Sequence, residues 1–160
     1  MDDREKMFRD LLDGLAAALN LPEIATTEEG CSALVVIDDF ELCLRCISTG
    51  HVLLFTVVAP LPENNRQEIM AALLDANTFY YQTQGFTLAA REDTGVTLQV
   101  VISLRVLDRN NIVTFVRNFL NVAGYWQKFC QDKANEAGTF IPLGSPRLPD
   151  DIRGMLYLRV

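Results

Sequence analysis

The sequence predicts an α+β domain, in which a twisted antiparallel sheet packs against helices in the order α-βββ-α-ββ-α. Three segments carry apolar residues at helical spacing, at about 3–20, 66–80 and 108–134. Between them lie five short apolar segments, several of them alternating, joined by polar or glycine-containing links that are typical of hairpins. The length suits one core, so we expect one domain over 1–136 and a C-terminal extension over 137–160.

The first expected helix, 3–20, is amphipathic. Asp2 or Asp3 can cap it, and Pro22 ends it. Its apolar stripe comprises Met7 or Phe8, Leu11, Leu12, Leu15 and Leu19. A stripe this rich in leucine packs on the core, offers a groove to a partner, or does both.

Three strands are expected next, over 31–37, 40–48 and 51–59. The pairs Asp38-Asp39 and Thr49-Gly50 separate them, which predicts an antiparallel meander with tight turns. The second strand has one apolar face and one partly polar face, because its side chains alternate. The apolar face comprises Phe40, Leu42, Leu44 and Cys46.

The four cysteines are interpreted as reduced, buried thiols. Cys43 and Cys46 have the spacing of a redox or zinc motif, and Cys31 and His51 are the only additional ligands at hand. That motif normally lies in a turn, whereas here it falls inside an alternating strand. Residues three apart on a strand point to opposite faces, so packed thiols are favoured and a metal or redox protein is a lesser alternative.

The second half of the chain predicts a helix, a hairpin and a long helix. The helix at 66–80 ends at the break marked by Gly85. Strands at 86–91 and 96–106 follow, joined by the turn sequence "EDTG". Asp108 can cap the final helix, which at 1.5 Å per residue is long enough, at roughly 40 Å, to cross a whole sheet.

Charge and residue inventory exclude several classes of function. The net charge of −7 would repel nucleic acid and anionic membranes. The N-terminus, "MDDREKMF", lacks the basic and apolar regions of a secretory signal, and no apolar run reaches the length of a membrane span, so we expect a cytoplasmic protein. One histidine, no glycine-rich phosphate loop and no recognisable pair of carboxylates favour a protein without catalytic residues, metal or cofactor.

Residues 3 to about 134 resemble the class I type III secretion chaperones of the Tir-chaperone family. The most specific stretch is "LLDANTFYYQTQGFTLAAREDTGVTLQVVISL", which has the family's helix with a leucine pair and an Asn, then a Gly, a strand, an acidic turn and an apolar strand. The stretch "LDRNNIVTFVRNFLNVAGYWQKF" is similar to its final helix, and "LLFTVVAPLPE" to the strand before its middle helix.

The resemblance implies a cytoplasmic homodimer that binds one secreted effector near its N-terminus, keeps that segment non-globular for export and has no catalytic activity. It places the dimer interface on the middle helix and the strand after it. The candidate dimer residues are Leu73, Leu74, Phe79 and Tyr80. It places the partner surface on the first helix and the meander, where an extended segment can add to a sheet edge. The candidate partner-binding residues are Leu11, Leu15, Leu34, Val36, Phe40, Leu42 and Leu44. For every residue in both sets, packing within the chain's own core is the alternative.

Two further hypotheses accompany this interpretation. The same fold suits a chaperone-like domain outside secretion, which would bind a resident protein or act as a regulator. The extension ends in the apolar stretch "GMLYLRV". Residues 140–160 are expected to dock on an apolar surface of the same or a neighbouring subunit, partly filling a partner groove. The alternatives are a tail that packs permanently on its own core and one that is ordered only by crystal contacts.

Overall fold

The sheet has five antiparallel strands in the order β1-β2-β3-β5-β4. The computed structural model describes residues 3–27, 29–47 and 50–136, so the expectations for 137–160 lie outside the described residues. The elements are α1 (Asp3–Ala18), β1 (Ser32–Ile37), β2 (Phe40–Ile47), β3 (His51–Ala59), α2 (Arg66–Asn77), the 3-10 turn η1 (Thr78–Tyr80), β4 (Thr87–Arg91), β5 (Gly95–Ser103) and α3 (Ile112–Asn135). The predicted fold class and element order are confirmed.

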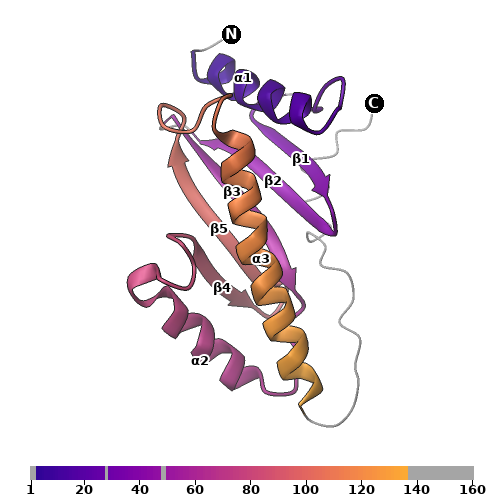
Figure 1. Cartoon of the computed structure of the whole chain (residues 1–160), viewed down its shortest axis with the longest axis vertical. Coiled ribbons are helices and arrows are strands. Elements are labelled where there is room, and N and C mark those ends of the chain that lie inside the picture. The colour runs from indigo at the N-terminus through magenta and orange to yellow at the C-terminus, as the bar shows by residue number, and fades with distance from the viewer. Residues whose placement is uncertain (1–2, 28, 48–49, 137–160) are drawn as a thin grey trace.

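The three predicted hairpins, β1–β2, β2–β3 and β4–β5, are present in the sheet. Ile37 pairs with Phe40 across a two-residue turn, in which Asp38 has a φ of 52°, as the primed hairpin turns require. β4 and β5 pair from Thr87 opposite Gln99 to Arg91 opposite Gly95. In Figure 1, α3 runs along one face of the sheet, α1 lies at one end of it near the start of α3, and α2 lies beside β4.

One core fills the space between the sheet and α1 and α3. Alternate strand residues face these helices and are fully buried, among them Leu42, Leu44, Leu54 and Leu98. The helices contribute Phe8, Leu11, Phe119, Ala123 and Cys130, all with no exposed area. Trp126 packs edge to face on Phe129 with ring centroids 5.1 Å apart. Burial of these large side chains is the main stabilising contribution to the fold.

Cys43 and Cys46 lie on opposite faces of β2. Cys46 belongs to the main core, whereas Cys43 pairs with Leu34 and Phe55 on the other face. Two such side chains cannot converge on one ion, and within the described residues no group of three His, Cys, Asp or Glu could hold a metal. Burial raises the pKa of the Cys43 thiol to about 11 and that of Cys130 to about 12, so both are protonated at neutral pH.

The helix boundaries differ from the predicted ones by a turn. Asp108 carries the expected capping oxygen, which accepts hydrogen bonds from the N–H groups of Asn110 (2.8 Å) and Asn111 (3.2 Å). The Asp108 carbonyl accepts from the Ile112 N–H at 3.0 Å, and regular α3 begins there. The middle helix ends at Asn77 rather than at residue 80, because Phe79 and Tyr80 have positive φ angles.

Candidate functional site

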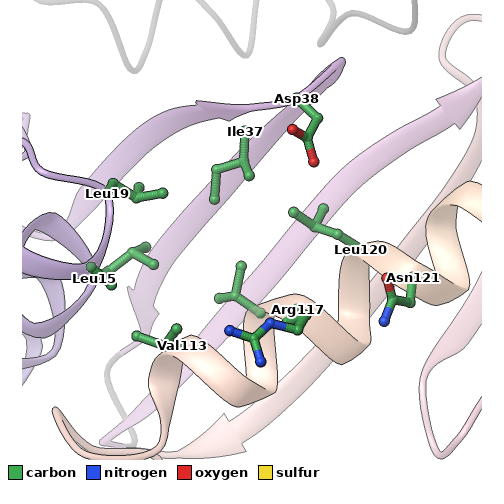
Figure 2. A pocket seen from close by; sticks show the side chains of 10 residues that line it. Leu15, Leu19, Ile37, Asp38, Val113, Arg117, Leu120 and Asn121 are labelled. Carbon is green, nitrogen blue, oxygen red and sulfur yellow. The ribbon is translucent and has the colours of Figure 1, made fainter.

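An apolar pocket lies between α1, the end of β1 and α3. It has a volume of about 260 Å³, and Figure 2 shows its walls. The apolar lining comprises Leu15, Ala18, Leu19, Ile37, Val113, Val116 and Leu120. The polar lining comprises Asp38, Arg117 and Asn121. We call this site the α1–α3 pocket.

Local sequence patterns explain how three elements build the α1–α3 pocket. Leu15 of α1 and Leu19 just after the helix are four residues apart and so lie on the same side, and Asn20, with a φ of 55°, turns the chain away. Val113, Val116 and Leu120 follow the same spacing along α3. Apolar residues at helical spacing from the two helices therefore form two walls of the pocket.

The side chains that line the pocket are suited to binding a ligand. Its ten lining residues include no Ser, Thr, Cys, His or Lys, so none of its side chains is a conventional nucleophile or general base at neutral pH other than the carboxylate of Asp38. Apolar walls with a few polar groups at the edge suit an apolar side chain of a ligand. Arg117 and Asp38 can then contact polar or charged groups beside that side chain.

The pocket lies at the end of β1, where Ile37 and Asp38 line it, and β1 is one of the two edge strands of the sheet. Among the described residues, the segment before β1 pairs with the first half of this edge. Thr27 donates its N–H to the Ser32 carbonyl at 2.9 Å, and Thr26 forms a bridge with Ala33. The second half runs past Val36, whose side chain is 62% exposed, to Ile37 at the pocket. An edge of this kind offers main-chain groups to an added strand.

The seven predicted partner-binding residues fall into two groups. Five are buried in the core of the chain: Leu11, Leu15, Phe40, Leu42 and Leu44. These five side chains pack within the chain's own core, although Leu15 also lines the α1–α3 pocket. Leu34 is half-buried and Val36 is exposed, both on the β1 face that points away from α3. The partner-binding role of the set stays a prediction.

The predicted dimer residues are mostly exposed. Leu73 is buried against the core, but Leu74 and Phe79 are 72% and 80% exposed. Neighbouring apolar side chains extend the area, and we call the whole the α2 surface. It comprises Met70, Leu74, Phe79, Tyr80 and Tyr81. Met70 and Tyr81 are not among the predicted dimer residues, although the run "FYYQ" was an available signal for Tyr81. The dimer role of these residues also stays a prediction.

The backbone under the α2 surface is constrained. Phe79 and Tyr80 have φ angles of 60° and 57°, a region that bulky residues rarely occupy. The Asn77 amide holds the segment on β4, because its Nδ2 donates to the Leu88 carbonyl and its Oδ1 accepts from the Leu88 N–H, both at 2.9 Å. Backbone strain of this kind persists only where the surroundings fix it, and it is concentrated at functional sites.

Residues 10–127 match the Tir chaperone protein (CesT) family. The chain belongs to the Tir chaperone protein family. The resemblance inferred from the sequence is therefore confirmed, and the chain is a chaperone of this family. No curated protein sequence matches it closely enough to be compared.

Solved structures of other proteins share the fold of this Tir chaperone family member. A chain of the ExsC–ExsE complex has a TM-score of 0.69 at 24% identity, covering 81% of this chain and 97% of that one. A chain of the HopA1–SchA chaperone–effector complex has a TM-score of 0.63 at 19% identity, with 80% and 98% covered. The Yersinia pestis type III secretion chaperone SycH, in complex with a fragment of YscM2, gives 0.60 at 20% identity, with 74% and 98% covered.

None of the helices within the described residues has the length and apolar character needed to cross a membrane.

Proposed function

We propose that this protein is a cytoplasmic, dimeric type III secretion chaperone, which binds the N-proximal segment of a secreted effector and keeps it non-globular for export. Membership of the Tir chaperone family supports the class of function. The structural relatives described as a chaperone–effector complex and as a type III secretion chaperone with a bound fragment support the mode of action. The observation that carries the proposal for this chain is the α1–α3 pocket at the end of the edge strand β1.

The effector segment binds in an extended conformation along the second half of β1. Main-chain hydrogen bonds to the Val36 region supply affinity for any sequence, whereas the α1–α3 pocket selects an apolar side chain. A segment paired in this way cannot pair with the rest of its own chain, and so it stays out of a globular fold. Leu34 and Val36, with Leu15 in the pocket wall, are the predicted residues best placed for this contact.

The α2 surface serves a different contact, between two copies of the chain. Exposed aromatic and aliphatic side chains on one rigid segment are typical of the centre of a protein interface. A two-fold axis would bring the same surface of both copies together. Burial of Leu74 and Phe79 in the dimer would then account for their exposure in the single chain.

The proposal is tested by isolating the natural partner from bacteria that carry this gene and measuring its binding. We expect a protein that the cells export, and its N-proximal fragment alone should bind. Val36→Asp should weaken binding at least about tenfold, because a charge is introduced beside the added strand. Val106→Asp is the matched control, since Val106 is 63% exposed but lies after β5, away from the pocket.

A partner that is not exported would favour the alternative, a chaperone-like regulator outside secretion. Binding that needs the folded partner and is equally strong in wild type, Val36→Asp and Val106→Asp would contradict the proposed site.

A further inference from the structure

Cys31 and Cys46 lie directly opposite each other across the β1–β2 hairpin. Ser32 pairs with Arg45 and Ala33 with Leu44, so the register continues to the two cysteines. The Cys46 N–H donates to the Cys31 carbonyl at 2.7 Å, which confirms the alignment at that position. The two residues are equally distant from the Asp38-Asp39 turn.

Both side chains point to the helix-facing side of the sheet. Cys46 follows Leu42 and Leu44 at every second position, and Cys31 precedes Ala33 in the same way. Cys46 is part of the main apolar cluster, and Cys31 packs against it. The Cα atoms of a hydrogen-bonded antiparallel pair are about 5.5 Å apart, a separation that a disulfide spans.

The other two cysteines have no such partner. Cys43 pairs with Leu34 of β1 and with Phe55 of β3, and Cys130 is a buried residue of α3. Both are buried thiols with raised pKa values, so they react slowly with oxidants. Cys31 is half-buried and therefore open to a small oxidant, and neither Cys31 nor Cys46 is part of a disulfide in this structure. The Cys46 thiol donates a long hydrogen bond of 3.9 Å to the Ile47 carbonyl.

We propose that Cys31 and Cys46 form an oxidation site, at which hydrogen peroxide converts the opposed thiols into a cross-strand disulfide. The Cys31 thiolate attacks one peroxide oxygen, the O–O bond breaks, and with one proton a water leaves and a sulfenic acid remains. The Cys46 thiol then attacks the sulfenic sulfur, the S–O bond breaks, and a second water leaves as the S–S bond forms. The two thiols supply two electrons and two hydrogens to the peroxide, and a thiol reductant reverses the change.

The disulfide closes the open end of the hairpin. At this end the chain enters β1 after the turn at Gly30, and Thr27 donates its N–H to the Ser32 carbonyl. It links the edge strand covalently to its neighbour and so restricts movement of β1. In a reducing compartment such a bond is transient and responds to oxidants. This oxidation site does not depend on the proposed function, because it involves only the chain itself.

The test is treatment of the folded full-length protein with dilute hydrogen peroxide, followed by unfolding in denaturant, alkylation of the remaining thiols and intact mass spectrometry. We expect two thiols to become unreactive with a mass loss of about 2 Da, and a linked Cys31–Cys46 peptide after digestion. The melting temperature should rise by about 5–10 °C and return after reduction. Cys43→Ser and Cys130→Ser should retain the linkage, whereas Cys31→Ser should abolish it.

Cys31→Ser is the decisive variant, because Cys31 is half-buried and its replacement leaves the core intact. The proposal is overturned if all four thiols still alkylate after treatment. It is also overturned if Cys31 is oxidised to a sulfinic or sulfonic acid, or links two chains, without joining Cys46. None of these results would bear on effector binding, which is measured separately.

Discussion

The α1–α3 pocket and the α2 surface present apolar residues in opposite ways. In the pocket, Leu15 is buried and the apolar walls are set back behind Asp38 and Arg117. On the α2 surface, Leu74 and Phe79 project into solvent. A recess accepts single side chains of an extended segment, whereas projecting aromatic groups need another protein surface to cover them. The contrast supports our proposal that one region binds the partner and the other binds a second copy.

The largest expected effect is on the α2 surface. Leu74→Asp should convert a dimer, with about twice the 17.9 kDa of one chain, into a monomer. A charge forced into an apolar interface weakens association by roughly 100-fold or more. The variant should fold normally, because Leu74 is exposed in the single chain. Light scattering at micromolar concentration measures the mass, with Val106→Asp as the control. A wild-type monomer, or an unchanged dimer in Leu74→Asp, would exclude this surface as the interface.

The next effect concerns the packing that supports the pocket. A Cβ at Gly14 of α1 would lie 2.8 Å from the Arg109 carbonyl oxygen and 3.0 Å from its Cα. Gly14→Ala should therefore push α1 away from the chain before α3 and lower the free energy of unfolding by about 1–3 kcal/mol. Gly124→Ala is the control, because a Cβ there meets nothing within 4 Å, and alanine favours the helix. Chemical denaturation compares them, and equal stability would show that α1 is not fixed at Gly14.

A similar but smaller effect is expected where the α2 surface joins the sheet. Asn77→Ala removes both hydrogen bonds to Leu88 and should cost about 1–2 kcal/mol, while loosening the segment that carries Phe79 and Tyr80. Thr78→Ala is the control, since its hydroxyl donates only a long, exposed bond to the Leu74 carbonyl at 3.4 Å. Amide exchange should accelerate at Leu88 and through residues 78–81 in Asn77→Ala alone. Unchanged exchange there would mean that Asn77 does not hold the segment.

The smallest effect is electrostatic. Lys133 on α3 donates hydrogen bonds to Glu68 on α2 (2.7 Å) and to Glu136 (3.0 Å), and these bonds raise its pKa above the usual 10.5. A raised pKa contributes stability below pH 10.5 that is lost as the pH rises through the folded value. Lys133→Met should lower the melting temperature slightly at pH 7, and the difference should shrink above pH 10.5. Lys128→Met, which breaks a bond within α3 alone, is the control for the link between the helices.

The strands could be predicted from the sequence because their links are short and their side chains alternate. The strict alternation of Phe40, Leu42 and Leu44 also predicted one apolar face. These residues were predicted to bind the partner, with packing in the chain's own core as the alternative, and the structure places all three in the core. The opposition of Cys31 and Cys46 follows from the same hairpin once the turn is fixed at Asp38-Asp39.

The exposed positions of the α2 surface could not be predicted in the same way. α2 has apolar residues around most of its circumference, so the neighbours Leu73 and Leu74 look alike in the sequence. Only packing against β4 turns Leu73 inward and Leu74 outward. The α1–α3 pocket depends on three elements far apart in the chain, and no local pattern shows that their side chains leave a space between them.

Hydrogen exchange of the dimer, with and without the N-proximal fragment of its natural partner, tests the central claim most directly. An added strand along the second half of β1 should slow exchange at Val36 and Asp38 by about tenfold or more, and leave residues 78–81 unchanged. Slowed exchange confined to residues 70–81, with none at β1, would contradict the account.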